Sequence, residues 1–300
     1  MSDKHFKYGR HQEEWDACIN DPELRELSLT WLTEKNSLDR WRHDNMYSLL
    51  KPIIEWNPAA SWLTVGDGRY GTDGNALMQM GAENVHCSDL SDTLLKIGAE
   101  KGFISSYSSE NAEALNFSDN SFEFVYCKES FHHFPRPYVA LDEMFRVATT
   151  AVILTEPRDF LIDRGLLQTF LPLITKLMGK SFQEHRFEEV GNYVYTISER
   201  EMEKFLLGMN YTHFAFFGTN DSYLQDIEFV DLRSTDPKDK KLIRKIKTRI
   251  LLQDILVKLG IRKSGLLSVV LFKKEPNDSL KDALTSIGWR FKNLPKNPYQ

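Results

Sequence analysis

The most constraining feature of this 300-residue sequence is a glycine-rich turn that directly follows an apolar run. Residues 61–65, Ser-Trp-Leu-Thr-Val, have the composition of a buried strand. Gly66, Gly68 and Gly71 then form a G-x-G-x-x-G pattern. Glycine permits positive φ and has no Cβ, so the turn can be tight and its backbone can lie against a ligand. The pattern predicts a strand, a turn and a helix, with a binding site at the turn.

A carboxylate follows at the spacing that a nucleoside site requires. Residues 84–88 read as the next parallel strand, and Asp89 stands at its carboxyl end, about twenty residues after the glycine turn. An acid at this position can accept hydrogen bonds from both ribose hydroxyls. The site predicted is therefore one for a nucleoside-containing cofactor. Because a nicotinamide dinucleotide and S-adenosylmethionine both carry an adenosine, this pattern alone does not separate them.

Strand and helix patterns alternate along the first half of the chain. Strands are expected near 61–66, 84–88, 122–127 and 150–156, and helices near 73–81, 91–101 and 137–147. Two later strands, near 211–217 and 266–273, are separated by a long helix near 237–259. This βαβ rhythm predicts an α/β fold, a Rossmann-like, doubly wound and mostly parallel sheet with helices on both faces.

Three segments lie outside this rhythm. Residues 1–55 carry helical spacing and are expected to form an N-terminal helical lid before the core domain of residues 56–275. An apolar helical insertion is expected at about 160–195, and residues 276–300 are expected to be a tail. Since the tail is rich in aromatic residues from Trp289 to Tyr299, it is predicted to close over the acceptor side of the pocket with the N-terminal helices. Packing on the outside of the sheet or against a second subunit is an equal alternative.

Further motifs follow the helix predicted near residues 91–101. Ala112-Glu113 precedes the strand near 122–127, the run Lys128 to His133 follows it, and Glu156-Pro157 ends the next strand. With these motifs, residues 45–160 resemble the class I S-adenosylmethionine-dependent methyltransferases. The resemblance implies a seven-stranded sheet and S-adenosylmethionine as cofactor. It also implies that the segment ending in His-His faces the methyl group.

The resemblance assigns the cofactor-binding residues one by one. They are Gly66, Asp67, Gly68, Arg69, Gly71, Asp89, Leu90, Ala112, Glu113 and Lys128. Thr64 departs from the family pattern, which usually has an acid two residues before the first glycine. Arg69 is expected to pair with the cofactor carboxylate, aided by backbone N–H groups at the start of the following helix.

The methyl acceptor determines which side chains take part in the chemistry. If the acceptor is a hydroxyl, a general base is useful, and the His132-His133 pair is the best candidate, with His133 ahead of His132. An amine acceptor needs only a carboxylate to hold the nitrogen, and Glu156 or Glu129 suits that role. The expected acceptor is a small molecule or glycan building block, methylated on O or N; a sugar or polysaccharide intermediate is one guess within this class.

The composition of the chain limits which binding partners and which cellular location are expected. The formal net charge of −5 argues against nucleic acid, because neutralising phosphates requires a basic surface. Cys18, Cys87 and Cys127 are too few and too scattered for a disulfide framework or a metal site, so a cytoplasmic location is expected. No apolar run is long enough to span a bilayer. Peripheral membrane contact and homodimerisation stay open.

Two other classes of function compete with methyl transfer. An NAD-dependent oxidoreductase would share the glycine pattern, but no Tyr-x-x-x-Lys follows the glycine turn; the one such spacing, Tyr47 to Lys51, precedes it. The second alternative is a cofactor-binding protein without catalytic activity, for which the departures at Thr64 and Asp67 are the argument.

Overall fold

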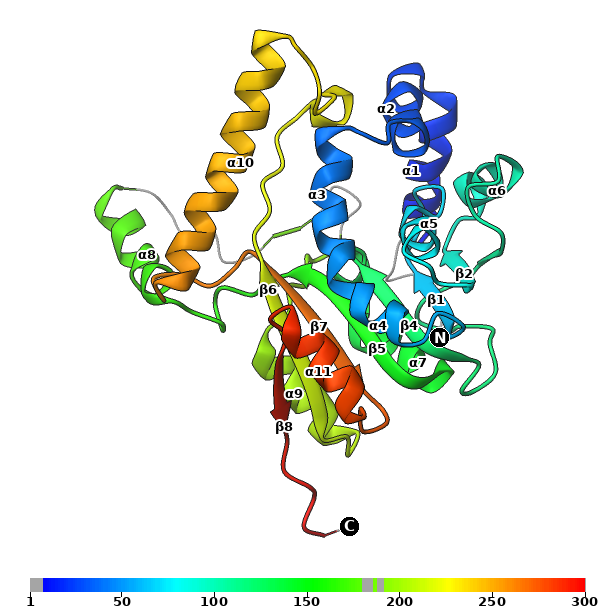
Figure 1. Ribbon diagram of the computed structural model, residues 1–300, viewed down its shortest axis with the longest axis vertical. Helices are drawn as coiled ribbons and strands as arrows, with labels where there is room; N and C mark the ends of the chain where they lie inside the picture. The colour runs from blue at the N-terminus through cyan, green and yellow to red at the C-terminus, as the bar shows by residue number, and fades with distance from the viewer. Residues whose placement is uncertain (1–7, 180–185, 188–191, 300) are drawn as a thin grey trace.

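In a computed structural model of the protein, one mixed sheet forms the centre of the molecule (Figure 1). The structure describes residues 8–179, 186–187 and 192–299. Within them the sheet has eight strands in the order β3-β2-β1-β4-β5-β7-β6-β8. The strands are β1 (Ser61–Val65), β2 (Asn84–Asp89), β3 (Tyr107–Ser109), β4 (Phe122–Lys128), β5 (Ala148–Pro157), β6 (His213–Thr219), β7 (Leu266–Phe272) and β8 (Arg290–Asn293).

The first five strands are mutually parallel, and β7 runs antiparallel to both β5 and β6. The mostly parallel, doubly wound sheet predicted from the sequence is confirmed. Chain direction across the sheet reverses between β1 and β4, since the path moves outward to β3 and then returns to the other side. In such sheets a crevice opens at this reversal, outside the carboxyl ends of the strands.

Eleven α-helices surround the sheet in the described part of the chain (Figure 1). They are α1 (Tyr8–Asn20), α2 (Pro22–Thr33), α3 (Leu38–Tyr47), α4 (Lys51–Trp56), α5 (Thr72–Gln79), α6 (Thr93–Glu100), α7 (Pro137–Val147), α8 (Leu166–Leu177), α9 (Glu199–Gly208), α10 (Pro237–Lys258) and α11 (Asp278–Ser286). No helix among the described residues is long and apolar enough to cross a membrane.

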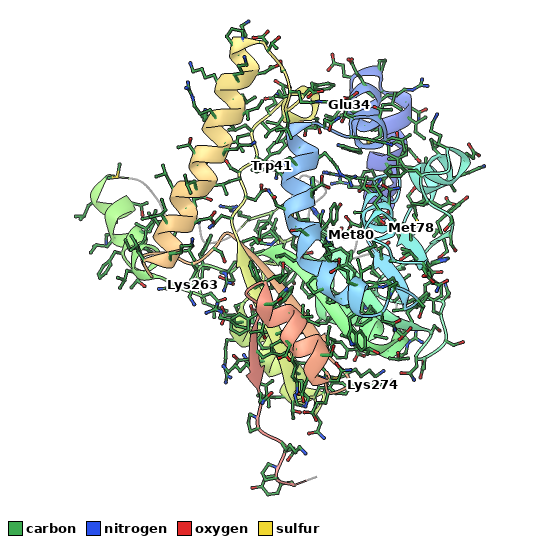
Figure 2. All side chains as sticks on the ribbon, viewed as in Figure 1. Glu34, Trp41, Met78, Met80, Lys263 and Lys274 are labelled. Carbon is green, nitrogen blue, oxygen red and sulfur yellow. The ribbon has the colours of Figure 1, made fainter. Side chains whose placement is uncertain are left out.

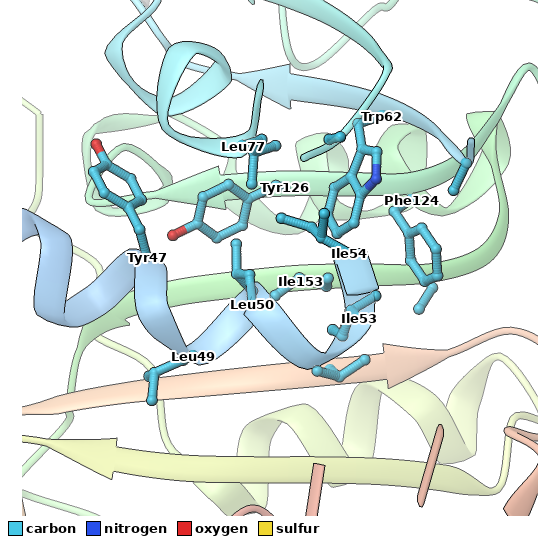
Figure 3. Close-up of a cluster of buried hydrophobic side chains, with 14 of the residues drawn as sticks. Tyr47, Leu49, Leu50, Ile53, Ile54, Trp62, Leu77, Phe124, Tyr126 and Ile153 are labelled. Carbon is cyan, nitrogen blue, oxygen red and sulfur yellow. The ribbon is translucent and has the colours of Figure 1, made fainter. Parts of the chain in front are cut away.

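Alternation along the strands builds two apolar cores. On β4, Phe124 and Tyr126 face one side of the sheet, and Val125 and Cys127 face the other. Helices α4, α5, α6 and α11 cover the first side, where the α4 residues Ile53 and Ile54 lie over the β1 and β4 aromatic rings (Figure 3). Helices α7 and α9 cover the second side. Burial on both faces explains why the central strands read as continuous apolar runs.

Local signals in the sequence place several helix ends. Asp21 accepts hydrogen bonds from two backbone N–H groups of the first turn of α2, and at the start of α9 Ser198 Oγ accepts from the Glu201 N–H and donates to the Glu201 carboxylate. Asp236 caps α10, with Pro237 at its first position. These side chains satisfy N–H groups that have no partner inside the helix.

The C-terminal segment differs from the prediction that it closes over the pocket. Residues 278–286 form α11, and residues 290–293 form β8, which pairs with β6 and makes the sheet eight-stranded rather than seven-stranded. Trp289 is buried beneath α4, and its Nε1 donates to the Leu49 carbonyl at 3.2 Å. The lid prediction for the tail is therefore wrong, because its aromatic residues complete the core and the sheet edge instead.

The N-terminal helices lie near the carboxyl edge of the sheet. Helix α1 packs on α2 and α6, and α3 packs on the segment that follows β6. That segment leaves β6 at the same edge, since β6 is parallel to β5. It brings residues 221–230 alongside α3, where Leu38 donates its N–H to the Val230 carbonyl. Elements from both ends of the chain thus meet above the crevice.

Candidate functional site

The glycine turn wraps tightly around the carboxyl end of β1. Gly66 has φ +77°, and a Cβ there would lie 2.4 Å from the Cβ of Ser130, whose Oγ donates to the Gly66 carbonyl at 2.7 Å. Gly71 also has φ +77° and caps α5. A Cβ on Gly68 would lie 2.6 Å from the ring of Trp15. The turn therefore requires glycine at all three positions.

Asp67 supports the turn from within. It is buried, and its carboxylate accepts from Thr64 Oγ1 at 2.8 Å and from the backbone N–H groups of Asp73 and Gly74, each at 2.9 Å. Burial raises the pKa of Asp67 well above its ordinary value. Position 64, where the family pattern usually has an acid, is a threonine here, and an acid stands three residues later at Asp67. Its hydrogen bonds attach the turn to the first turn of α5.

Asp89 lies opposite the turn and is almost fully buried. Its carboxylate accepts from the backbone N–H of Ser91 at 3.1 Å, and also from the Gly68 N–H and the Trp15 indole N–H. Burial raises the pKa of this carboxyl to about 6, although these hydrogen bonds act in the opposite direction. Trp15 has no local signal in the sequence, and only the packing of α1 brings it here.

A cavity of about 280 Å³ opens between the glycine turn and the segment after β4. It is lined by Trp15, Val65, Gly66, Arg69, Asp89, Leu90, Glu110, Asn111, Ala112, Glu113, Ser130, His133, Phe134 and Pro135. Six of the ten predicted cofactor residues meet here. Glu113 binds the backbone N–H and guanidinium of Arg136, so it also anchors the segment after His133.

A larger cavity of about 530 Å³ adjoins the first. Trp15, Gly66, Arg69, Ser130 and His133 line both cavities, so the two meet at the carboxyl ends of β1 and β4. The larger cavity also holds Asp67 and Lys128, two further predicted cofactor residues. Gly68 and Gly71 line neither cavity; their backbone shapes the turn.

The charged groups of the larger cavity are mostly paired with one another. Lys128 is buried and lies 3.4 Å from Asp73 Oδ1 and 3.4 Å from Glu129 Oε2. Glu129 has φ +49°, a left-handed conformation that is strained for a residue with a side chain. Arg69 is an exception among the described residues: it pairs with no carboxylate, and its guanidinium lies 4.5 Å from the centre of the Trp31 ring.

Helix α3 supplies a second charged group to this cavity. Arg42 pairs with Asp39 at 2.6 Å and with Asp221 from the segment after β6. Burial opposes the charge of Arg42, but the Asp221 carboxylate outweighs it and raises the pKa of the guanidinium. Burial, followed by the charge of Lys128, lowers the pKa of His43 well below its ordinary value, so His43 is neutral near pH 7.

His132 and Glu156 form a hydrogen-bonded pair at the edge of the larger cavity. His132 Nδ1 lies 2.6 Å from Glu156 Oε2, and Glu156 is fully buried at the end of β5. The other oxygen of Glu156 accepts from the backbone N–H groups of Ser130 and Phe131, each at 2.9 Å. These three hydrogen bonds hold the Glu156 carboxyl group in place and fix the orientation of the imidazole.

The segment before α9 holds the same histidines by their backbone. The Tyr195 N–H donates to the His132 carbonyl at 3.2 Å, and Asn192 Nδ2 donates to the His133 carbonyl at 2.9 Å. The rings of His132 and His133 lie 4.0 Å apart. Sequence reasoning considered Glu156 as an acceptor-binding acid, and its role in orienting His132 appears only in the tertiary structure.

Fold and site together define a doubly wound α/β protein with a nucleoside-type pocket beside a second, polar cavity. Residues 63–154 match the family model described as a methyltransferase domain. The chain thus contains a methyltransferase domain at these residues, and S-adenosylmethionine is the methyl donor that such a domain implies.

Solved structures also resemble this chain in fold. A putative methyltransferase from Bacillus halodurans is 19% identical, with 75% of this chain and 96% of that chain covered and a TM-score of 0.43. The YcgJ protein from Bacillus subtilis is 18% identical, with 78% and 99% covered and a TM-score of 0.47. A putative sarcosine dimethylglycine methyltransferase from Galdieria sulphuraria is 14% identical, with 79% and 86% covered and a TM-score of 0.48. None of these likenesses carries an argument about the acceptor. Among curated proteins, none matched the sequence.

The residues of the smaller cavity fit S-adenosylmethionine. Asp89 offers a buried carboxylate to a ribose diol, and Leu90, Ala112 and Phe134 offer apolar surface to an adenine. Arg69 stands where the two cavities meet and can pair with an amino-acid carboxylate. The glycine turn contributes no side chain of its own at positions 66 and 68, where Ser130 and Trp15 pack against the backbone.

Affinity for S-adenosylmethionine should depend on pH through Asp89. Because the pKa of this carboxyl is raised to about 6, it is ionised at neutral pH and protonated below that value. Protonation removes an acceptor that the ribose needs. Calorimetry should show affinity falling by about tenfold between about pH 7.5 and about pH 5. In Asp89→Asn, affinity should be weaker at neutral pH and nearly constant across this window; an identical pH dependence in the variant would contradict the assignment.

Proposed function

We propose that this enzyme methylates a hydroxyl group of a small, polyhydroxylated molecule, such as a sugar or a glycan intermediate, bound in the larger cavity. The observation that carries the proposal is the His132–Glu156 pair at 2.6 Å. A buried carboxylate that orients an imidazole is the arrangement expected for a general base. Since a hydroxyl must lose its proton during transfer, such a base is useful for oxygen.

The chain's residues then have distinct roles. S-adenosylmethionine, when bound, supplies an activated methyl group. With Nδ1 bonded to Glu156, Nε2 of His132 is the atom that would accept the proton of the acceptor hydroxyl, and Glu156 would stabilise the resulting imidazolium. The glycine turn and Ser130 hold the neighbouring wall rigid, because an in-line displacement requires precise alignment.

The lining of the larger cavity supports a polar acceptor. Aromatic rings of Trp31, Tyr47 and Tyr223 stand among carboxylates and guanidinium groups. His43 and Glu228 also line this cavity, and each has a side-chain atom without a hydrogen-bond partner in the described part of the chain. Buried polar groups are normally paired, so hydroxyls of a ligand would complete these sites. Aromatic faces together with such polar groups suit a sugar ring.

An amine acceptor is the second candidate, and the acidic character of the cavity favours it. Its lining has seven Asp and Glu residues and four Lys and Arg residues. Glu129 lines the larger cavity and would hold an ammonium group or amine nitrogen. In this case His132 would position the acceptor without accepting a proton.

The helices before residue 56 would act as the lid of this site. Residues of α1, α2 and α3 line the larger cavity, among them Trp15, Trp31 and Tyr47. A lid that excludes water would favour methyl transfer to the acceptor over side reactions.

Methyl transfer to a panel of acceptors tests the proposal. Release of S-adenosylhomocysteine should be stimulated by monosaccharides, nucleotide sugars or glycosides, with the new methyl on oxygen in the product. The same assay should give little release with matched amino sugars in which only the amine is available. Methylation confined to nitrogen would reject the hydroxyl acceptor and support the second candidate.

A further inference from the structure

The most exposed apolar surface in the described part of the chain lies far from the cofactor pocket. It is formed by α8, by the C-terminal half of α10 and by residues next to the ends of these helices, and we call it the α8/α10 surface. Its apolar members are Ile162, Leu166, Leu167, Phe170, Leu173, Leu177, Met178, Leu251, Leu252, Ile255 and Leu259. Leu166, Leu177 and Leu259 expose 63%, 79% and 66% of their area. Monomeric soluble proteins rarely expose so many large apolar side chains together.

The first turn of α8 contacts the segment that follows α10, so these side chains belong to one surface. The Leu167 N–H donates to the Ile261 carbonyl at 2.7 Å, and Gly165 lies close against Arg262. Figure 1 shows α8 beside the end of α10 on one side of the molecule, and Figure 2 shows Lys263 at that junction. On α8, residues 166, 170, 173 and 177 follow helical spacing and present one apolar face.

The two halves of helix α10 differ in how far their apolar side chains are buried. In its first half, Ile246 is buried, and Leu242, Ile243 and Ile250 pack with it against α3. In its second half, Leu251, Leu252 and Ile255 are exposed. The buried half explains why the helix forms, whereas the exposed Leu251, Leu252 and Ile255 belong to no apolar core cluster of the described structure.

Charge is distributed very unevenly around this surface. Residues 237–263 contain ten Lys and Arg residues and two Asp residues, whereas the whole chain has a formal net charge of −5. Helix α8 contains no Asp or Glu, and Arg164 and Lys176 flank its exposed face. Asp254, one of the two acids on α10, accepts a hydrogen bond from Asn220. Among the described residues, Arg164, Lys176, Lys258, Arg262 and Lys263 are cations close in sequence to the exposed apolar faces, and Asp163 and Asp254 are acids close to them.

We propose that the α8/α10 surface docks onto the surface of an anionic lipid bilayer. Apolar side chains that extend from a helix face can enter the boundary between headgroups and acyl chains, and neighbouring Lys and Arg residues attract anionic headgroups. A second copy of the chain fits less well, because a two-fold contact would bring identical basic groups together. The bilayer is the one occupant that complements both the apolar residues and the charge.

Vesicle sedimentation with the full-length protein tests this inference. The protein should sediment with vesicles of phosphatidylcholine and phosphatidylglycerol and bind much more weakly to vesicles of phosphatidylcholine alone. Phe170→Glu combined with Leu173→Glu should weaken binding to the anionic vesicles by at least about tenfold. Lys176→Glu combined with Lys258→Glu should weaken it by about tenfold at low salt, with a smaller difference at high salt.

Matched substitutions elsewhere provide the controls. Leu24→Glu on α2 and Lys96→Glu on α6 also change exposed residues, and they should leave vesicle binding within about twofold of the unaltered protein. All variants should retain affinity for S-adenosylmethionine, which reports folding independently of the acceptor.

Three outcomes would overturn the inference. One is an absence of binding to anionic vesicles by the unaltered protein. Another is equal binding by the Phe170/Leu173 variant and the Leu24 control. The third is a dimer that becomes monomeric in the Phe170/Leu173 variant without any vesicle binding, which would assign the surface to a second copy. None of these outcomes depends on which acceptor the enzyme methylates.

Discussion

His132→Ala is expected to lower turnover by about a hundredfold or more, while affinity for S-adenosylmethionine stays nearly unchanged. The imidazole is oriented by Glu156, a fully buried carboxylate at 2.6 Å, and borders the larger cavity but not the smaller one. Its loss removes the proton acceptor without changing the cofactor pocket. Steady-state kinetics at saturating substrate and calorimetry separate the two effects.

One further variant and a pH profile extend this test. Glu156→Gln keeps an oxygen near His132 but removes the negative charge that would stabilise the imidazolium, so turnover should fall by about tenfold. Turnover of the unaltered enzyme should rise with pH as the imidazole loses its proton, and His132→Ala should lack this rise.

His133→Ala is the comparison that matters most, because the sequence analysis places His133 ahead of His132. His133 lines both cavities, but the hydrogen bond to the buried Glu156 belongs to His132. We therefore expect the smaller loss of turnover in His133→Ala. A larger loss in that variant would reverse the assignment, and a flat pH profile with normal turnover in both variants would favour an amine acceptor.

Gly68→Val is expected to weaken binding of S-adenosylmethionine by at least about a hundredfold. A Cβ at this position lies 2.6 Å from the Trp15 ring, so either the ring or the glycine turn must move. Either movement disturbs the site, because Trp15 lines both cavities and its indole donates to Asp89. The Gly68 N–H is itself a donor to that carboxylate.

Gly208→Val is the matched control for this substitution. Gly208 ends α9, and a Cβ there meets no atom within 4 Å. This variant should bind S-adenosylmethionine like the unaltered protein. Calorimetry on both variants, with circular dichroism to establish folding, makes the comparison. Native affinity in a folded Gly68→Val protein would show that the turn does not shape the cofactor pocket.

The sequence by itself determined the core of the fold and the position of the proposed cofactor pocket. The apolar runs at β1, β4 and β5 report burial on both faces, and the helical spacing between them reports crossovers. The glycine turn and Asp89 each stand at the end of a strand, so a local pattern suffices to place them at the same sheet edge. Helix ends were predictable for the same reason, since capping acts within three residues.

Short elements at the edge of the sheet were not predictable in this way. Strand β3 has three residues and β8 has four, and such lengths show no period. The aromatic residues near Trp289 appeared to be a lid because their partner, the turn before α4, is 240 residues away in the sequence. No local pattern records a contact over that distance.

Only the tertiary structure decided how the second cavity is built and which histidine is oriented. Trp15 reaches Asp89 through the packing of α1, Glu156 reaches His132 across 24 residues, and Arg42 reaches Asp221 across 179. Spacing along the chain reflects backbone hydrogen bonding and burial, which are local. The convergence of side chains depends instead on which strands are neighbours and where each connection crosses the sheet. For this protein, the sequence therefore predicts where the proposed cofactor pocket lies, and the fold determines which side chains line the larger cavity beside it.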